Sequence, residues 1–305
     1  MSSAMTPATI TECNQRVTAS FAAAPLLAVP SRPLLRYHGG KWQLGAWINS
    51  LMPRHRIYVE PFGGGASVLL QKPRSYAEIY NDLDGEIVNL FQVVRDNGAA
   101  LKRVVELTPF ARAEFELSVE PSPDPVEQAR RTLVRSYMGF GGNLTRLTVS
   151  GRLEHTGFRN YSKKNRRSIP AQDWRHWPAG LPELIQRLQG VIIERREACE
   201  VMLKHDGPDT LHFVDPPYVH ETRGRTNSYR HEMDEDAHRR LAVVLNELQG
   251  GVILAGYGCP LYDDELYVGW KRITRKAFAD GARERTEVLW LRNVEAHGML
   301  PGLDG

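Results

Sequence analysis

Residues 211–220, LHFVDPPYVH, place an acid, two prolines and an aromatic ring at the end of an apolar run. The run predicts a buried strand that ends at Asp215, on the edge where open α/β sheets present ligand-binding groups. Pro216 and Pro217 have a fixed φ and no N–H, so their carbonyls are held outside the strand ladder. An acceptor side chain, a fixed carbonyl and the flat ring of Tyr218 suit a planar base with an exocyclic amine. A rigid turn that only ends a strand is the alternative, but it requires neither acid nor ring.

A glycine-rich turn follows an earlier apolar run, in YVEPFGGGAS at residues 58–67. Glycines let the backbone approach a ligand closely, and a helix after the turn would present free N–H groups. The spacing does not match GxGxxG, and GxxxxGK[ST] is absent from the sequence. A dinucleotide and a nucleoside triphosphate are therefore disfavoured. A tight turn without any ligand is the alternative.

Asp82 ends the next predicted strand, YAEIYND at residues 76–82, where an acid can bind the ribose hydroxyls of an adenosyl group. Taken alone, Asp82 and Asp84 are better explained as N-cap residues of the following helix. A glycine turn after one strand and an acid after the next together favour an adenosyl cofactor. RYHGGKWQ at residues 36–43 adds an aromatic, two glycines and Lys41, although by itself it would indicate only a surface turn.

Two blocks with alternating strand and helix patterns position these motifs. In the first block, strands at residues 56–60 and 76–82 are each followed by a predicted helix, at 67–71 and 85–96. The second block, residues 188–293, predicts strands at 190–194, 211–215 and 250–257, helices at 197–204 and 234–248, and an antiparallel hairpin from 269–277 and 285–293.

The alternation predicts parallel strands joined by right-handed crossovers, and hence a Rossmann-like α/β sheet. Residues 97–187 begin with helical patterns, continue with glycine, arginine and asparagine turns, and contain no strong parallel strand. We interpret them as an inserted, mostly helical domain. The predicted organisation is a flexible leader at 1–32, an α/β domain at 33–96 and 188–293, the insert at 97–187 and a tail at 294–305.

The charge is distributed unevenly along the chain, although the net charge is only +3. Residues 130–167 contain ten Lys or Arg and one acid, so this segment carries +9 and the remainder −6. Four aromatics interleave with these charges, which favours nucleic acid over a simple solvated face. The loop at 220–232 is basic too, and a mobile surface loop is its alternative. The predicted DNA contacts are Arg130, Arg131, Arg146, Arg152, Lys163, Lys164, Arg166, Arg167, Arg223, Arg225 and Arg230.

Composition excludes several other classes of protein. No window of about 18 apolar residues suggests a membrane span, and residues 1–32 lack the basic start and apolar core of a secretory signal. The three cysteines, Cys13, Cys199 and Cys259, have no CxxC or Cys/His spacing, which argues against a disulfide framework and a zinc site. We therefore expect a cytoplasmic protein without a metal.

In four motifs taken in order, the chain resembles the bacterial and phage DNA adenine-N6 methyltransferases of the Dam type, the D12 class. YHGGK is similar to the amino-terminal cofactor motif, although Tyr37 and His38 replace the usual Trp-Ala. EPFGGGAS is similar to the glycine motif, NDLDGEIVNLF to the segment whose acid contacts the cofactor, and DPPY to the catalytic motif. The resemblance runs over most of residues 34–293.

The resemblance implies S-adenosylmethionine as the cofactor and a target-recognition domain in the insert. The implied catalytic residues are Asp215, Pro216, Pro217 and Tyr218. The implied cofactor contacts are Tyr37, Lys41, Asp82 and Asp215, with Phe62, Gly63 and Gly65 shaping the pocket. The family's acid-aromatic pair before DPPY has no counterpart that can be assigned among Glu194, Glu197 and Glu200.

The implied reaction is direct methyl transfer to the N6 amine of an adenine flipped out of double-stranded DNA, without a metal. Hydrogen bonds from the amine to Asp215 and to the Pro216 carbonyl would free the nitrogen lone pair for attack. The resemblance implies a prokaryotic or phage-infected cell and raises a cognate restriction nuclease as a partner. The residues alone leave a cytosine-N4 or RNA methyltransferase, or an inactive DNA-binding relative, as alternatives.

Overall fold

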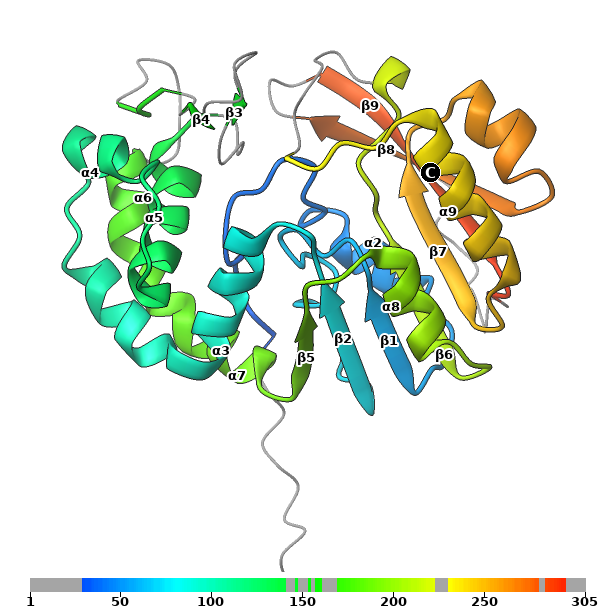
Figure 1. The fold of residues 1–305 in the computed structure, drawn as a ribbon, viewed down its shortest axis with the longest axis horizontal. Coiled ribbons are helices and arrows are strands. Elements are labelled where there is room, and N and C mark those ends of the chain that lie inside the picture. Colours follow the sequence, from blue (N-terminus) through cyan, green and yellow to red (C-terminus); the bar gives the residue numbers. More distant parts are fainter. Residues whose placement is uncertain are drawn as a thin grey trace, which may run out of the picture.

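The structure is a computed structural model that describes residues 29–140, 146–147, 153–154, 157–160, 169–222, 230–279 and 283–294. Its centre is a seven-stranded sheet with the strand order β5-β2-β1-β6-β7-β9-β8 (Figure 1). The strands are β1 (Ile57–Glu60), β2 (Ala77–Asn81), β5 (Val191–Glu194), β6 (Thr210–Val214), β7 (Gly251–Gly256), β8 (Lys271–Ala279) and β9 (Arg283–Arg292).

The first five strands in this order are parallel, and β9 and β8 are antiparallel. From β1 the chain proceeds outward to β2 and β5, then returns to place β6 on the other side of β1. The strand order therefore reverses between β1 and β6, and ligands of open α/β sheets bind beside the carboxyl ends at such a point. The predicted α/β sheet and its terminal hairpin are confirmed.

Alternate residues of each strand are buried on opposite faces of the sheet. Ile253 and Ala255 of β7 belong to the hydrophobic core of one face, whereas Val252 and Leu254 pack on the other face with α9 (Glu235–Glu247). Strands covered on both faces read as continuous apolar runs, which explains the predicted strand at 250–257. In Figure 1, α8 (Ala198–His205) and α9 lie in front of the sheet.

The helix after β2 begins where the sequence predicts but extends further. Asp84 is the N-cap of α3 (Gly85–Glu106), and its side chain accepts a hydrogen bond from the Glu86 N–H. A kink at Asn97, with φ −139°, joins two helical stretches within α3. The predicted domain boundary between residues 96 and 97 coincides with the kink between these two stretches.

The predicted helix at residues 67–71 is wrong, because this segment forms only hydrogen-bonded turns. Ala66 has φ +49°, and the Leu69 N–H donates to the Glu60 carboxylate at 3.0 Å instead of to a backbone carbonyl. A left-handed residue and a diverted N–H both interrupt a helical ladder. The apolar residues at 68–70 are nevertheless fully buried.

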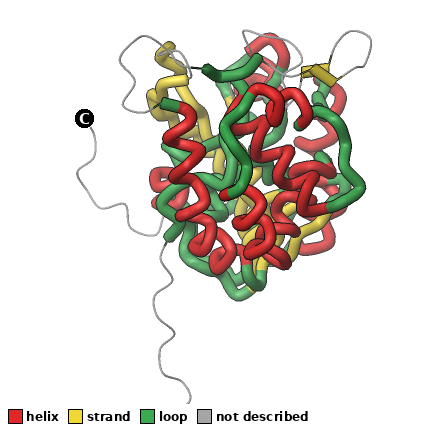
Figure 2. The backbone as a smooth tube through the Cα atoms, turned by 90° about the vertical axis from the view of Figure 1, so that its left-hand side faces the viewer, coloured by secondary structure: helices red, strands yellow, loops and turns green. Residues whose placement is uncertain are grey.

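Between β2 and β5 the chain forms a group of helices beside the sheet (Figure 1). Its members after α3 are α4 (Arg112–Leu117), α5 (Pro125–Met138), α6 (Pro170–His176), the short 3₁₀ helix η1 (Trp177–Gly180) and α7 (Leu181–Leu188). Figure 2 views this side, where the helices cover much of the sheet behind them. Core residues of α5 and η1 belong to the same hydrophobic cluster as residues of β1 and β6, so the helices share a core with the sheet.

The two-residue strands β3 (Arg146–Leu147) and β4 (Leu153–Glu154) pair with each other outside the main sheet. In Figure 1 they lie above the helical group, at the level of the β8–β9 hairpin. None of the described helices combines the length and apolar character needed to cross a membrane.

Candidate active site

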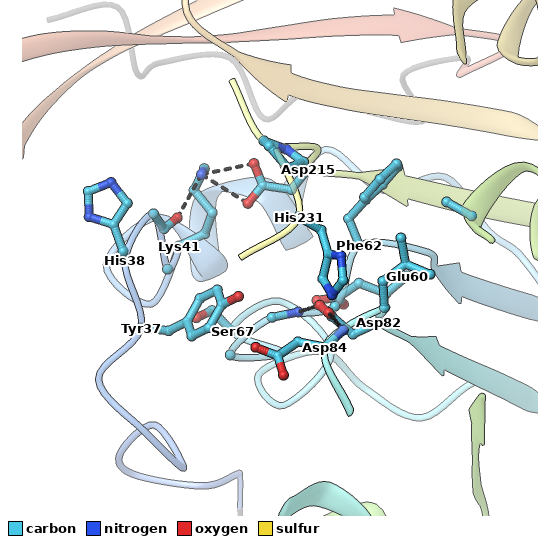
Figure 3. A pocket seen from close by; sticks show the side chains of 18 of the residues that line it. Tyr37, His38, Lys41, Glu60, Phe62, Ser67, Asp82, Asp84, Asp215 and His231 are labelled. Carbon is cyan, nitrogen blue, oxygen red and sulfur yellow. Dashed lines mark hydrogen bonds and ion pairs between the residues drawn. The ribbon is translucent and has the colours of Figure 1, made fainter. Parts of the chain in front are cut away.

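A pocket opens at the carboxyl ends of β1, β2 and β6, where the strand order reverses (Figure 3). Its walls come from the segment before α2 (Gly45–Ser50), the glycine turn after β1, the acids after β2, and the chain after β6. All seven predicted cofactor contacts line it: Tyr37, Lys41, Phe62, Gly63, Gly65, Asp82 and Asp215. Of the four predicted catalytic residues, Asp215 and Pro217 also line this pocket.

Asp215 follows the last residue of β6 and forms an ion pair with Lys41. Lys41 Nζ donates to both carboxylate oxygens at 3.0 Å and to the Gly39 carbonyl at 2.9 Å. The Asp215 side chain is 18% exposed and the Lys41 side chain is 5% exposed. Burial raises the pKa of Asp215, and the positive charge of Lys41 opposes that shift without cancelling it. Lys41 thus offsets only part of the effect of burial on Asp215, and this carboxyl group lines the pocket.

Tyr218 is buried beside this pair. Lys41 Nζ lies 4.8 Å from the centroid of its ring, within the range of a cation–π contact. The Tyr257 ring meets it edge-on at 4.7 Å between centroids. Tyr218 is only 5% exposed and does not line the pocket, so its ring packs beside the ion pair and not on the pocket surface.

Asp82 braces the glycine turn. Its Oδ2 accepts the Gly64 N–H and its Oδ1 accepts the Asp84 N–H, each at 2.8 Å. Burial raises the pKa of Asp82, against the effect of these two hydrogen bonds. The helix-cap alternative applies to Asp84, which caps α3, and not to Asp82.

The glycines after β1 are required by close packing. A Cβ on Gly63 would lie 2.1 Å from the Tyr80 ring, and one on Gly64, whose φ is +45°, would lie 2.7 Å from the Tyr37 ring. The Tyr80 hydroxyl donates to the Gly64 carbonyl at 2.8 Å. The turn is therefore held between two aromatic side chains, with its backbone at the pocket surface.

Glu60, the last residue of β1, also lines the pocket and was not identified from the sequence. Its Oε2 accepts the Tyr58 hydroxyl at 2.7 Å and the Leu69 N–H at 3.0 Å. Burial raises the pKa of Glu60 to about 8. An acid at the end of a buried strand was the signal used for Asp82 and Asp215, and it applies equally to Glu60.

Arg230, predicted to contact DNA, lies against the pocket. Its guanidinium donates to Asp84 at 2.8 Å and lies 3.1 Å from Glu86. Glu86 in turn accepts from Arg135 of α5. Residues 230–233 line one side of the same pocket as Asp215 and Pro217 of the DPPY motif. Arg223 and Arg225 lie outside the described residues.

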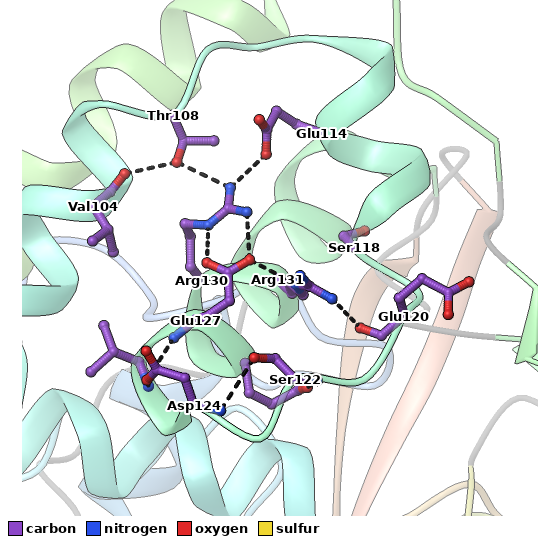
Figure 4. Close-up of polar contacts among 12 residues, drawn as sticks. Val104, Thr108, Glu114, Ser118, Glu120, Ser122, Asp124, Glu127, Arg130 and Arg131 are labelled. Carbon is purple, nitrogen blue, oxygen red and sulfur yellow. Dashed lines mark hydrogen bonds and ion pairs between the residues drawn. The ribbon is translucent and has the colours of Figure 1, made fainter.

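Arg130 and Arg131 belong to a polar network within the helical group (Figure 4). Arg130 donates to both oxygens of Glu127 at 2.7 Å and to Glu114 at 2.7 Å, and it is only 8% exposed. Arg131 donates to Glu127 and to the Glu120 carbonyl. Acids of the helical group engage both guanidinium groups, which gives them a role in helix packing, and their predicted contact with DNA stays a prediction.

The remaining basic residues of the predicted DNA surface cannot be placed individually. Arg146 belongs to β3. Arg152, Lys163, Lys164, Arg166 and Arg167 lie outside the described residues.

The acids before β6 do not line the pocket. Glu194 pairs with Lys204, Glu197 caps α8, and Glu200 pairs with Arg196. Only Ala198 of this segment reaches the pocket wall. Among the described residues, no group of three or more His, Cys, Asp and Glu side chains is arranged to hold a metal ion.

Comparison with known proteins adds an independent finding. A profile of the family described as D12 class N6 adenine-specific DNA methyltransferase matches residues 37–278. The type II methyltransferase M1.LlaDCHI of Lactococcus lactis subsp. cremoris is 26% identical over 66% of this chain and 71% of its own length. The DNA adenine methylases of Escherichia coli K12 and Haemophilus influenzae are each 25% identical, over 68% and 62% of this chain and 74% and 64% of their own lengths.

Proposed function

The chain belongs to the D12 class N6 adenine-specific DNA methyltransferase family, and we propose that its pocket holds S-adenosylmethionine beside a flipped-out adenine. It is an adenine-specific DNA methyltransferase, and its family uses S-adenosylmethionine. Family membership decides between adenine in DNA and the cytosine or RNA alternatives that the residues left open. The observation that carries the proposal is the convergence of Asp215, Lys41, Asp82 and the glycine turn on one pocket.

The residues of the pocket fit this cofactor. The glycine turn brings backbone to the pocket surface where any Cβ would collide with Tyr80 or Tyr37. The pocket is also lined by the acids Glu60, Asp82 and Asp215, which suit a ligand with positive groups. When bound, S-adenosylmethionine supplies an electrophilic methyl group on a sulfonium centre.

Glu60 is the pocket acid best suited to a cationic part of the cofactor. Its Oε2 accepts the hydrogen bonds from Tyr58 and Leu69, and within the described chain Oε1 accepts none. Because burial raises the pKa of Glu60 to about 8, a positive ligand group would stabilise its ionised form. We assign Glu60 to the cofactor's ammonium group and Tyr37 to the wall that packs on the cofactor.

Asp215 and the Pro216 carbonyl accept the two N–H groups of the adenine amine in this proposal. Lys41 already donates to both Asp215 oxygens, but each carboxylate oxygen has more than one lone pair and can accept an additional bond. Lys41 opposes the rise in the pKa of Asp215 that burial causes, and ionised Asp215 draws the amine out of conjugation so that its lone pair can attack. Tyr218 stacks on the base, which must leave the duplex to reach this depth.

The helical group and the β3–β4 pair are the proposed target-recognition region, because they flank the carboxyl edge of the sheet (Figure 1). Arg146 in β3 and the basic segment 161–168 supply phosphate contacts in this proposal. One relative is named a type II methyltransferase, and a cognate nuclease for this chain stays a prediction.

The test is to incubate the protein with methyl-labelled S-adenosylmethionine and unmethylated DNA of varied sequence, digest the DNA and identify the labelled nucleoside. We expect N6-methyladenine, with none from Asp215→Asn. Binding of S-adenosylhomocysteine, measured by calorimetry, should weaken in Gly63→Ala, because the added Cβ displaces the turn. Label on cytosine, or unchanged cofactor binding in Gly63→Ala, would contradict the proposal.

A further inference from the structure

Glu287 of β9 contacts Tyr218, the predicted base-stacking residue, which follows β6. Its Oε2 accepts a hydrogen bond from the Tyr218 hydroxyl at 3.1 Å, although the two residues are 69 positions apart. Glu287 is 9% exposed, and it does not line the cofactor pocket. A buried carboxylate held against a tyrosine of the DPPY motif calls for an explanation, because burial of an acid opposes folding.

We infer that Glu287 is a positioning residue for methyl transfer: it anchors the hydroxyl end of the Tyr218 side chain so that the ring can stack on the target base. The inference rests on the proposed function and assigns a second element, the β8–β9 hairpin, to the target-base site. Glu287 acts through Tyr218 and does not itself contact the cofactor pocket.

Contacts from several elements hold the Tyr218 ring, and its side chain also forms a hydrogen bond with Asp215. Lys41 Nζ lies 4.8 Å from its centroid, and the Tyr257 ring meets it at 78° between planes. These two contacts act on the ring itself, whereas a directional hydrogen bond at the hydroxyl fixes the position of the far end of the side chain. Glu287 supplies that bond from β9, where pairing with β8 holds its backbone.

The Tyr257 ring is in turn contacted by Arg285 of β9. Arg285 lies two residues before Glu287 on β9, and its guanidinium lies 5.2 Å from the Tyr257 centroid. Side chains two apart on a strand point to the same face, so Arg285 and Glu287 reach the Tyr257 and Tyr218 rings from one side. The hairpin therefore braces both aromatic rings next to Asp215.

An acid is a costly acceptor at this place. The negative charge of Glu287 contributes to the raised pKa of Asp215, after burial and against the effect of Lys41. Arg275 lies directly opposite Glu287 in the β8–β9 register, and its guanidinium lies 5.5 Å from the Trp47 ring. Glu287 therefore bonds the predicted base-stacking ring and lies near enough to Asp215 to influence that carboxyl group.

The test compares Glu287→Ala, Glu287→Gln and Tyr218→Phe with wild type, using DNA that carries 2-aminopurine at the target adenine. We expect Glu287→Ala to lower kcat/KM for DNA by about 10- to 100-fold, as for a small misplacement of a catalytic group. The 2-aminopurine fluorescence in the complex should rise, because a base that stacks less is quenched less. The Kd for S-adenosylhomocysteine should not change.

The amide oxygen of Glu287→Gln can accept the same hydrogen bond, so this variant should recover most of the activity. Removing Glu287 in a Tyr218→Phe background should cause little further loss, because the shared bond is already gone. Thr286→Ala is the matched control: Thr286 is the exposed neighbour on β9 and points to the opposite face. Circular dichroism and thermal unfolding check that each variant folds.

Additive losses in the double variant, no recovery in Glu287→Gln, or unchanged fluorescence would overturn the inference. These outcomes are distinct from failure of the proposed function, in which wild type itself forms no N6-methyladenine or Asp215→Asn stays active. If Glu287→Ala does not fold, Glu287→Gln and Tyr218→Phe still decide, since the inference requires near-normal stacking in the first and impaired stacking in the second.

Discussion

Two buried lysine–carboxylate pairs lie at opposite ends of the parallel strands. Lys72 Nζ donates to Glu78 at 2.9 Å near the start of β2, and Lys41 Nζ donates to Asp215 at 3.0 Å just after the end of β6. Glu78 also accepts two bonds from Arg187, at 2.7 and 2.9 Å, and one from the Ser75 N–H. Asp215 instead faces a pocket.

The surroundings decide what each carboxylate can do. Burial would raise the pKa of Glu78, but hydrogen bonds and charges from Arg187 and Lys72 lower it overall. Burial also raises the pKa of Asp215, and there the single lysine does not reverse the shift. A saturated carboxylate holds the fold together, whereas an incompletely compensated one beside a cavity can accept a ligand.

The largest expected effect is on catalysis at Asp215. Asp215→Asn keeps the shape but weakens the acceptor for the amine, so kcat should fall by about 10³-fold, comparable to loss of an electrostatic stabiliser. Thermal unfolding should change little, since burial disfavours the charge that is removed. If Asp215→Asn lowered the stability but left full activity in the folded fraction, Asp215 would be the structural carboxylate and the comparison would be wrong.

The matching change at the other end should affect stability. Glu78→Gln leaves Lys72 and Arg187 with one charge less between them, and the free energy of unfolding should drop by about 3–5 kcal/mol. Denaturant titration measures the drop, and activity at low temperature should stay near that of wild type. If Glu78→Gln lost methyl transfer without losing stability, the Lys72–Glu78 pair would have a catalytic role and not a structural one.

Glu60 extends the comparison to a buried carboxyl without a bonded cation. Its pKa is raised to about 8 from 4.5, so the folded protein binds this proton more tightly than the unfolded chain does. The tighter proton binding adds to the free energy of unfolding. This addition is fully present below the unfolded pKa and is lost as the pH rises toward 8, by at most about 1.4 kcal/mol per pH unit. Urea unfolding measured from about pH 6 to pH 8 should show a free energy of unfolding that declines less steeply with pH for Glu60→Gln than for wild type.

The smallest expected effect is a displaced pH profile. Lys41→Met removes the main influence that lowers the pKa of Asp215, so this pKa rises further and the acid limb of kcat moves to higher pH. We expect a shift of about one pH unit. Lys72→Met, the equivalent change in the other pair, should leave the limb in place and reduce stability instead.

The sequence predicted the site better than it predicted the connecting elements. Asp82 and Asp215 end strands that were recognisable as apolar runs, and parallel strands bring their carboxyl ends to one edge. The helix expected at 67–71 was wrong because a buried side chain, Glu60, takes the Leu69 N–H. The ion pairs of Arg130 with Glu114 and Glu127 were not predicted, because an arginine in the sequence does not show whether neighbouring helices supply acids to pair with it.

By itself the sequence determined the class of fold, the family and seven residues that the structure brings together around one pocket, because periodicity and short motifs are local properties of the chain. Only the tertiary structure decided which charges meet: Lys41 and Asp215 are 174 residues apart, and Tyr218 and Glu287 are 69 apart. The reason is that pairing depends on strand order and register, which bring distant residues together without leaving a local pattern. The DPPY segment was therefore recognisable at once, whereas the groups that orient its acid and its ring were not.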